Sequence, residues 1–245
     1  MPKQKKKKNI NIEPVFRIFC EGEKTEPYYI RGYIDQYHSY KKSLVVIQDT
    51  NKNTPIALVD EAVNYKRSGN VGDVYWVVFD REAVSKYDHA KHLEARQKAK
   101  SNGIEIAFSN VCFEVWVSLH LTYSASSYSC CDDLLKNNDF RKSLKSIGIN
   151  NYDKGLPLLF NALSQSDGVN TAIQNAEKIN KTALNSAAQG MTAPHYLNPY
   201  TDVHELLIDM KMFIDGQPSI RKQKPSNFLY QVSNMQSNSE FPHPF

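Results

Sequence analysis

The chain has 245 residues, a formal net charge of +4 and a hydrophobic content of 41%. This length is enough for one α/β domain with a smaller appendage. The sequence contains neither an apolar run long enough to cross a bilayer nor a secretory signal pattern, so we expect a soluble, cytoplasmic protein without membrane contact.

The positive charge is concentrated near the N-terminus, in Lys3 and in the four lysines of residues 5–8. A run of lysines is typical of a solvated, disordered tail, and a polybasic arm that touches phosphates is the alternative. The rest of the chain is close to neutral, so its composition does not predict a broad basic surface. We therefore predict a disordered basic tail over residues 1–13.

The first 110 residues alternate between apolar runs and amphipathic segments. Apolar runs predict strands at 14–20, 44–47, 74–79 and 104–108. Helical spacing predicts helices at 27–40, 54–68 and 86–101, the first with Thr25 as its cap and Pro27 in its first turn. This alternation predicts a mostly parallel sheet with helices on both faces.

The second half of the chain is predicted to be helical. Residues 112–121 fit a strand or a helix, and the spacing of Phe113, Trp116 and Val117 favours a helix. Further helices are predicted at 133–144, 157–163, 170–188 and 202–214, the last with Thr201 as its cap. The predicted domain plan is an α/β catalytic core at 14–123, a helical extension packed on it at 124–216, and a loose C-terminal tail at 217–245.

The four cysteines lie at Cys20, Cys112, Cys130 and Cys131 and lack the spacing of a metal site. Cys20 and Cys112 are inside apolar runs, which predicts buried thiols. Cys130 and Cys131 are adjacent and poorly placed to pair with each other. This usage fits a reducing cytosol.

Acidic side chains follow two of the predicted strands. Glu21 follows residues 14–20, and Asp80 with Glu82 follows residues 74–79. The carboxyl ends of parallel strands meet at one edge of a sheet, where α/β proteins build their sites. Converging carboxylates repel one another, and a hard divalent cation relieves this repulsion. The alternatives are a surface acidic turn at Glu21 and a helix cap at Asp80.

The residues after Glu21 predict a site for an anion. A helix that begins near Thr25 offers free N–H groups to a phosphate, and Lys24 is either a phosphate partner or a solvated surface residue. We expect Glu23 and Glu26 to be surface acids that complement the helix dipole.

Glu114 lies between Phe113 and Val115, where burial of a carboxylate is costly without a partner. It either completes a cluster with Glu21 and Asp80 or points to solvent. His120 is a candidate for proton transfer or phosphate binding, and the alternative is a satisfied core histidine.

Four segments together resemble the RloB-like proteins. They are Phe-Cys-Glu-Gly-Glu-Lys-Thr-Glu-Pro-Tyr-Tyr at 19–29, Val-Phe-Asp-Arg-Glu at 78–82, the stretch 109–120, and Asn-Pro-Tyr-Thr-Asp-Val at 198–203. The resemblance covers roughly residues 14–214 in the expected order. It implies a Toprim-like α/β core with Mg²⁺-dependent (or Mn²⁺-dependent) phosphodiester chemistry, a role in bacterial anti-phage defence, and an ATPase partner of the AAA or ABC type.

The resemblance also implies roles for individual residues. Glu21 would be the strand-end acid, acting as general base or metal ligand, and Asp80 with Glu82 would stand where Toprim proteins have an Asp-x-Asp pair. The expected sets are the metal ligands Glu21, Asp80 and Glu82, the catalytic residues Glu21, Lys24, Glu114 and His120, and the phosphate ligands Lys24 and Thr25.

The expected function is therefore a metal-dependent endonuclease that cleaves DNA or RNA. The alternative is a non-catalytic effector or regulatory subunit of an ATPase-containing complex, which the near-neutral body of the chain favours. A glycine-rich nucleotide-binding motif, which a nucleotide-sensing protein would need, is missing from the sequence. The sequence leaves open whether the chain forms a homo-oligomer.

Overall fold

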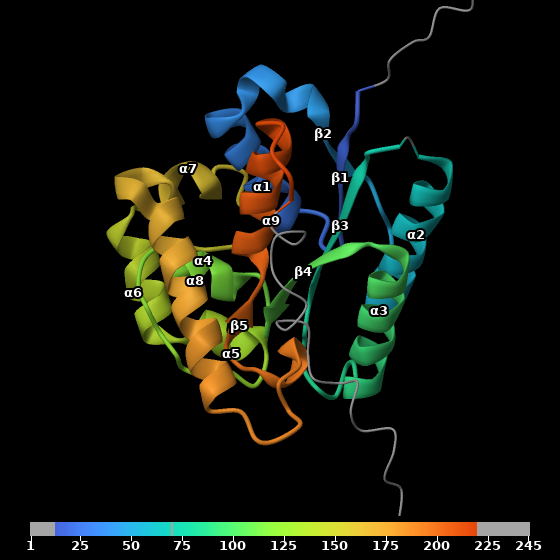
Figure 1. Ribbon diagram of the computed structural model, residues 1–245. Helices are drawn as coiled ribbons and strands as arrows, with labels where there is room; N and C mark the ends of the chain where they lie inside the picture. The colour runs from blue at the N-terminus through green and yellow to red at the C-terminus, as the bar shows by residue number, and fades with distance from the viewer. Residues whose placement is uncertain (1–12, 70, 220–245) are drawn as a thin grey trace, which may run out of the picture.

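The computed structural model describes residues 13–69 and 71–219 (Figure 1). The predicted basic tail therefore lies almost wholly outside the described residues, as does the predicted C-terminal tail beyond residue 219.

The centre of the molecule is a five-stranded sheet in the order β2-β1-β3-β4-β5 (Figure 1). Its strands are β1 (Phe16–Cys20), β2 (Val45–Gln48), β3 (Val74–Asp80), β4 (Glu105–Asn110) and β5 (Tyr200–Thr201). The first four are parallel, and β5 pairs with β4 in the antiparallel direction. The mostly parallel sheet is confirmed, whereas β5 occupies a segment for which only a turn and a helix cap were expected.

Helices cover both faces of the sheet, as the alternation predicted. One face carries α2 (Pro55–Ser68) and α3 (His89–Asn102), and in Figure 1 these two helices stand together on the right. The other face carries α1 (Thr25–Tyr37), α4 (Glu114–Leu119) and α9 (Val203–Ile214), together with the helices of residues 131–185. Alternate side chains of one strand enter the two cores, with Trp76 and Val78 on the larger side and Val77 and Phe79 on the smaller.

The larger core joins the sheet to the helical second half of the chain. Its helices are α1 (Thr25–Tyr37), α4 (Glu114–Leu119), α5 (Cys131–Lys136), α6 (Asn138–Ser146), α7 (Leu159–Leu163), α8 (Gly168–Asn185) and α9 (Val203–Ile214). Short 3₁₀ helices lie at Ser39–Leu44, Gln165–Asp167 and Pro194–Tyr196. Leu134, Phe140 and Ile179 pack in the same cluster as Trp76. Across the described ranges, no helix is both long and apolar enough to cross a membrane.

Several helix boundaries differ from those predicted. The first helix begins at Thr25, and the Thr25 hydroxyl accepts a hydrogen bond from the Gly155 N–H at 3.0 Å rather than capping the helix. The helix predicted at 133–144 is two helices, because the Asn137 side chain accepts from the N–H groups of Asp139 and Phe140 and starts α6 there. The Thr201 hydroxyl accepts from the N–H of Val203, the first residue of α9.

The cysteines also depart from expectation. Cys112 is buried, but it forms a disulfide with Cys131 rather than remaining a thiol. Cys20 is a buried thiol, as predicted, and Cys130 is a partly exposed one. The pairing joins the loop after β4 to the first turn of α5, two segments that sequence spacing does not connect.

Candidate functional site

A pocket of about 350 Å³ opens at the carboxyl edge of the sheet. The turn between β1 and α1, the end of β3 and the start of α4 line it, together with one loop from the helical half. Among the described residues, the lining has six acidic side chains and three lysines: Glu21, Glu23, Glu26, Asp80, Glu82, Glu114, Lys24, Lys86 and Lys154. We call this the acidic pocket.

Glu21 and Asp80 lie side by side at the ends of neighbouring strands. The Glu21 N–H continues the ladder between β1 and β3 by donating to the Val78 carbonyl at 2.9 Å. The Asp80 N–H donates to Oε2 of Glu21 at 3.3 Å. The parallel pairing of β1 with β3 therefore brings together two carboxylates that are 59 residues apart.

Asp80 is buried among the other carboxylates of the pocket. It is 8% exposed, and its Oδ1 is buried without a hydrogen-bond partner in the described part of the chain. Burial, and then the charges of Glu26, Glu114 and Glu21, raise the pKa of Asp80 well above its usual range. A buried acceptor in a negative field is a site that a cation would stabilise.

Glu26 belongs to this pocket, although its sequence position predicted a surface acid. It is 6% exposed, and burial, followed by the charge of Glu114, raises its pKa to about 7. Burial likewise raises the pKa of Glu21 to about 7. The expectation was wrong for Glu26 because the first turn of α1 faces the pocket, whereas Glu23 is exposed as predicted.

Glu114 forms an inner wall of the pocket and does not point to solvent. It is 1% exposed, accepts a hydrogen bond from the Tyr152 hydroxyl at 3.1 Å, and forms an ion pair with Lys154 at 3.6 Å. Its Oε2 also lies 3.4 Å from Sγ of Cys131. The helical half of the chain therefore supplies the partners of this acid.

Glu82 lies at the rim. Its carboxylate pairs with Lys86 at 2.9 Å, and both side chains are partly exposed. Its backbone has a φ of 56°, an unusual conformation for a non-glycine residue and one often found at functional sites.

Three lysines supply positive charge to the acidic pocket. Lys24 and Lys86 come from the two strand-end segments, and Lys154 comes from the loop between α6 and α7. Burial lowers the pKa of Lys154, but the carboxylates of Glu114, Asp80, Glu82 and Glu26 outweigh this effect and raise it. Neither Lys154 nor Lys86 was predicted as a site residue, because no periodic pattern marks Lys154 and the only signal for Lys86 is its position four residues after Glu82.

His120 lies in the core and not at the pocket. One ring nitrogen is 2.8 Å from the Tyr29 hydroxyl and the other is 3.0 Å from the Trp116 carbonyl. Burial lowers its pKa to about 4, so the ring is neutral near pH 7. These are the features of a satisfied core histidine, the alternative considered for this residue.

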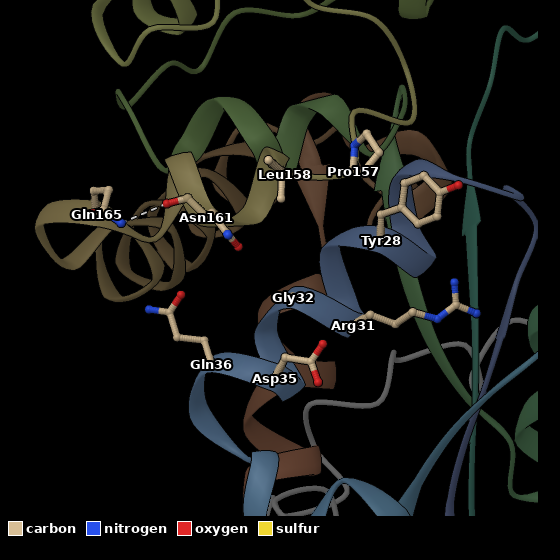
Figure 2. A pocket seen from close by; sticks show the side chains of 9 residues that line it. All are labelled: Tyr28, Arg31, Gly32, Asp35, Gln36, Pro157, Leu158, Asn161 and Gln165. Carbon is tan, nitrogen blue, oxygen red and sulfur yellow. Dashed lines mark hydrogen bonds between the residues drawn. The ribbon is translucent and has the colours of Figure 1, made fainter.

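A second cavity, of about 560 Å³, lies along the outer side of α1. Figure 2 shows Tyr28, Arg31 and Asp35 on α1, with Leu158 and Asn161 across from them. Its single arginine and single aspartate balance each other in charge. This cavity therefore lacks the concentration of charge that distinguishes the acidic pocket.

The carboxylate oxygens of the acidic pocket share one pocket but are too far apart to form a compact metal-ligand cluster. Within residues 13–69 and 71–219, the only set of three or more potential metal ligands whose donor atoms all lie within 4.8 Å of one another is Cys112, Glu114 and Cys131. Glu21, Asp80 and Glu82 share the pocket at wider spacing.

The fold and the site define an α/β protein with a charged pocket at the carboxyl edge of a mostly parallel sheet. The sequence profile of the RloB-like protein family matches residues 16–210, and the chain belongs to this family. No curated protein and no solved structure matches the chain.

Proposed function

We propose that this protein is a divalent-cation-dependent nuclease effector that cleaves phosphodiester bonds of nucleic acid in the acidic pocket. The observation that carries the proposal is the meeting of Asp80, Glu21 and Glu26 with Lys24 and Lys154 in one pocket. Carboxylates suit a hard cation, and ammonium groups suit the phosphate oxygens that accompany it.

The residues present fit Mg²⁺ or Mn²⁺. These cations prefer oxygen ligands, and Oδ1 of Asp80 is a buried acceptor left without a partner among the described residues. Asp80 and Glu21 would hold the cation, with Glu82 at the rim as a third carboxylate. When bound, the cation would supply Lewis-acid stabilisation of the charge that develops on the scissile phosphate.

The remaining groups of the pocket supply binding and proton transfer. Lys24 and Lys154 would hold non-bridging oxygens of the phosphate, and the N-terminus of α1 at Thr25 opens onto the same space. Glu26, with a pKa of about 7, can accept a proton on its carboxylate near neutral pH. His120 takes no part in this scheme because it lies in the core.

A second candidate function is a cation-binding regulatory subunit without catalytic activity. The wide spacing of the pocket carboxylates speaks against a catalytic centre assembled by this chain alone, since no three of these residues bring one oxygen each within 4.8 Å of one another in the part of the chain described. A partner that completes the site would reconcile both functions. The roles in anti-phage defence and with an ATPase partner are supported only by the resemblance to RloB-like proteins.

The direct experiment assays the purified chain on tRNA, single-stranded RNA and DNA with Mg²⁺, Mn²⁺ or a chelator. We expect cleavage that needs the cation and is lost in Glu21→Gln and in Asp80→Asn. Glu94→Gln, an exposed acid of α3, is the matched control and should cleave like the wild type. Cation binding without cleavage of any substrate would favour the regulatory subunit, and cleavage by the Glu21→Gln, Asp80→Asn double variant at the wild-type rate would refute the assigned chemistry.

A further inference from the structure

A second cluster of ligand-type side chains lies behind the inner wall of the acidic pocket. Glu114 lines the pocket, whereas Cys112 and Cys131 lie close to Glu114 and do not line it. All three residues are buried, and their donor atoms lie within 4.8 Å of one another. Two sulfurs and one carboxylate form a softer donor set than the oxygens of Asp80 and Glu21.

The distance between Cys131 and Glu114 is close to that between two ligands of a tetrahedral zinc ion. A Zn–S distance of about 2.3 Å and a Zn–O distance of about 2.1 Å place sulfur and oxygen ligands roughly 3.6 Å apart. Sγ of Cys131 lies 3.4 Å from Oε2 of Glu114. The Cα atoms of Cys112 and Cys131 are 5.6 Å apart, and after reduction of the bond between them the two sulfurs must separate to the roughly 3.8 Å of two zinc-bound thiolates.

The charges also suit a divalent cation. Two thiolates and the Glu114 carboxylate carry three negative charges, and Lys154 lies 3.6 Å from that carboxylate. A zinc ion together with Lys154 would neutralise the cluster. Three protein ligands leave a fourth position on a tetrahedral ion for a water molecule.

We propose that Cys112, Cys131 and Glu114 form a binding site for a thiophilic divalent cation, Zn²⁺, in the reduced protein. The site is distinct from the oxygen-lined position of the proposed nuclease cation and binds whether or not the protein cleaves nucleic acid. Its ion ties the loop after β4 to the first turn of α5 and fixes the Glu114 wall.

The disulfide between Cys112 and Cys131 is the oxidised, closed form of this site. A low-molecular-weight disulfide accepts two electrons from the two thiolates, so that the bond between the protein sulfurs forms, the reagent's S–S bond breaks, and two small thiolates leave. The zinc ion is released because its sulfur ligands are consumed. Zinc and the disulfide therefore exclude each other.

The test uses the full chain, reduced and loaded with Zn²⁺ or with Co²⁺ as a spectroscopic probe. We expect about one tightly held equivalent per chain and the charge-transfer absorption of Co²⁺–thiolate bonds. Both signals should be lost in Cys112→Ser and in Cys131→Ser. They should persist in the matched controls Cys20→Ser and Cys130→Ser, which replace the two cysteines outside the disulfide.

A second measurement on the wild type avoids any folding defect of the variants. Treatment with oxidised glutathione should release the bound zinc as two protein thiols disappear, and reduction should restore both. Retention of zinc by the oxidised chain, or no more Zn²⁺ or Co²⁺ on the reduced wild type than on a folded Cys112→Ser, Cys131→Ser double variant, would overturn the proposal. These readouts involve no cleavage, so their failure is distinguishable from failure of the nuclease assay.

Discussion

The two ends of β3 carry aspartates in opposite situations. Asp73 precedes the strand, its side chain is fully buried, and it accepts hydrogen bonds from the Val15 N–H at 2.8 Å, from Arg17 at 3.2 Å and from the Tyr75 hydroxyl at 3.2 Å. Asp80 ends the strand, and its neighbours are other carboxylates. The fold supplies hydrogen-bond donors and a positive charge to Asp73, whereas it surrounds Asp80 with negative charge.

This difference separates a structural carboxylate from a candidate functional one. Folding alone compensates the charge of Asp73, because an arginine and two hydrogen-bond donors come with the sheet. The same strand leaves Asp80 with an unpartnered buried oxygen among the described residues. Burial and charge alike would mark both residues as important, so what distinguishes them is whether the protein itself supplies the partner.

The largest expected effect is on activity. Asp80→Asn should lower the cleavage rate at least about 10³-fold, since it removes a charge that holds the cation and therefore weakens the main electrostatic stabilisation of the transition state. Asp73→Asn should leave the cleavage rate per folded molecule within about threefold of the wild-type rate. If kcat, measured on folded protein, fell equally in the two variants, the claim that only Asp80 is functional would be contradicted.

The next largest effect is on stability, where the Asp73 variant should lose more than the Asp80 variant. Asp73→Asn should lower the free energy of unfolding by roughly 2–3 kcal/mol, because it leaves Arg17 beside a neutral group. Asp80→Asn, measured in chelator, should not destabilise the protein and should raise Tm, because it removes a charge from a repulsive cluster. Urea titrations of both variants check this, and destabilisation by Asp80→Asn in chelator would contradict the repulsion described for the pocket.

The pH dependence of stability follows from the raised pKa values. Glu21 and Glu26 have pKa values of about 7 in the folded chain, against roughly 4.3 when unfolded, so the folded state holds more protons between these values. In chelator their contribution is therefore complete below about pH 4 and is lost as the pH rises to about 7, by up to roughly 3 kcal/mol per group. A difference of Tm between wild type and Glu26→Gln that stays flat from pH 5 to pH 8 would show that Glu26 has an ordinary pKa.

The smallest predicted effect concerns Lys154. Lys154→Gln should weaken substrate binding about three- to tenfold, because one phosphate partner is removed. Binding by this variant should also depend less steeply on salt concentration than binding by the wild type. Lys142→Gln, an exposed lysine of α6, is the control. A KM of Lys154→Gln equal to that of the wild type would show that Lys154 pairs with Glu114 but does not bind the substrate phosphate.

Local sequence patterns predicted the framework of the site. Apolar runs located β1 and β3, and the rule that parallel strands share a carboxyl edge placed Glu21 and Asp80 together. The burial of Glu26 was missed because it depends on how the first turn of α1 faces the sheet.

Contacts between distant loops could not be predicted from the sequence. Lys154 and Tyr152 reach Glu114 from a loop without periodic pattern, and Cys131 approaches Cys112 only because α5 packs beside α4. Such approaches are set by tertiary packing, which hydrophobic spacing within one segment does not encode.

The most direct test of the account is calorimetric titration of Mg²⁺ into the wild type and Asp80→Asn at pH 7, in two buffers of different ionisation enthalpy. We expect the wild type to bind the cation and to release at least about one proton, since Glu21 and Glu26 are near half protonation at this pH and the pKa of Asp80 is raised as well. We also expect Asp80→Asn to bind at least about tenfold more weakly. Equal binding by both proteins, or no binding by the wild type, would contradict the claim that the acidic pocket is a cation site.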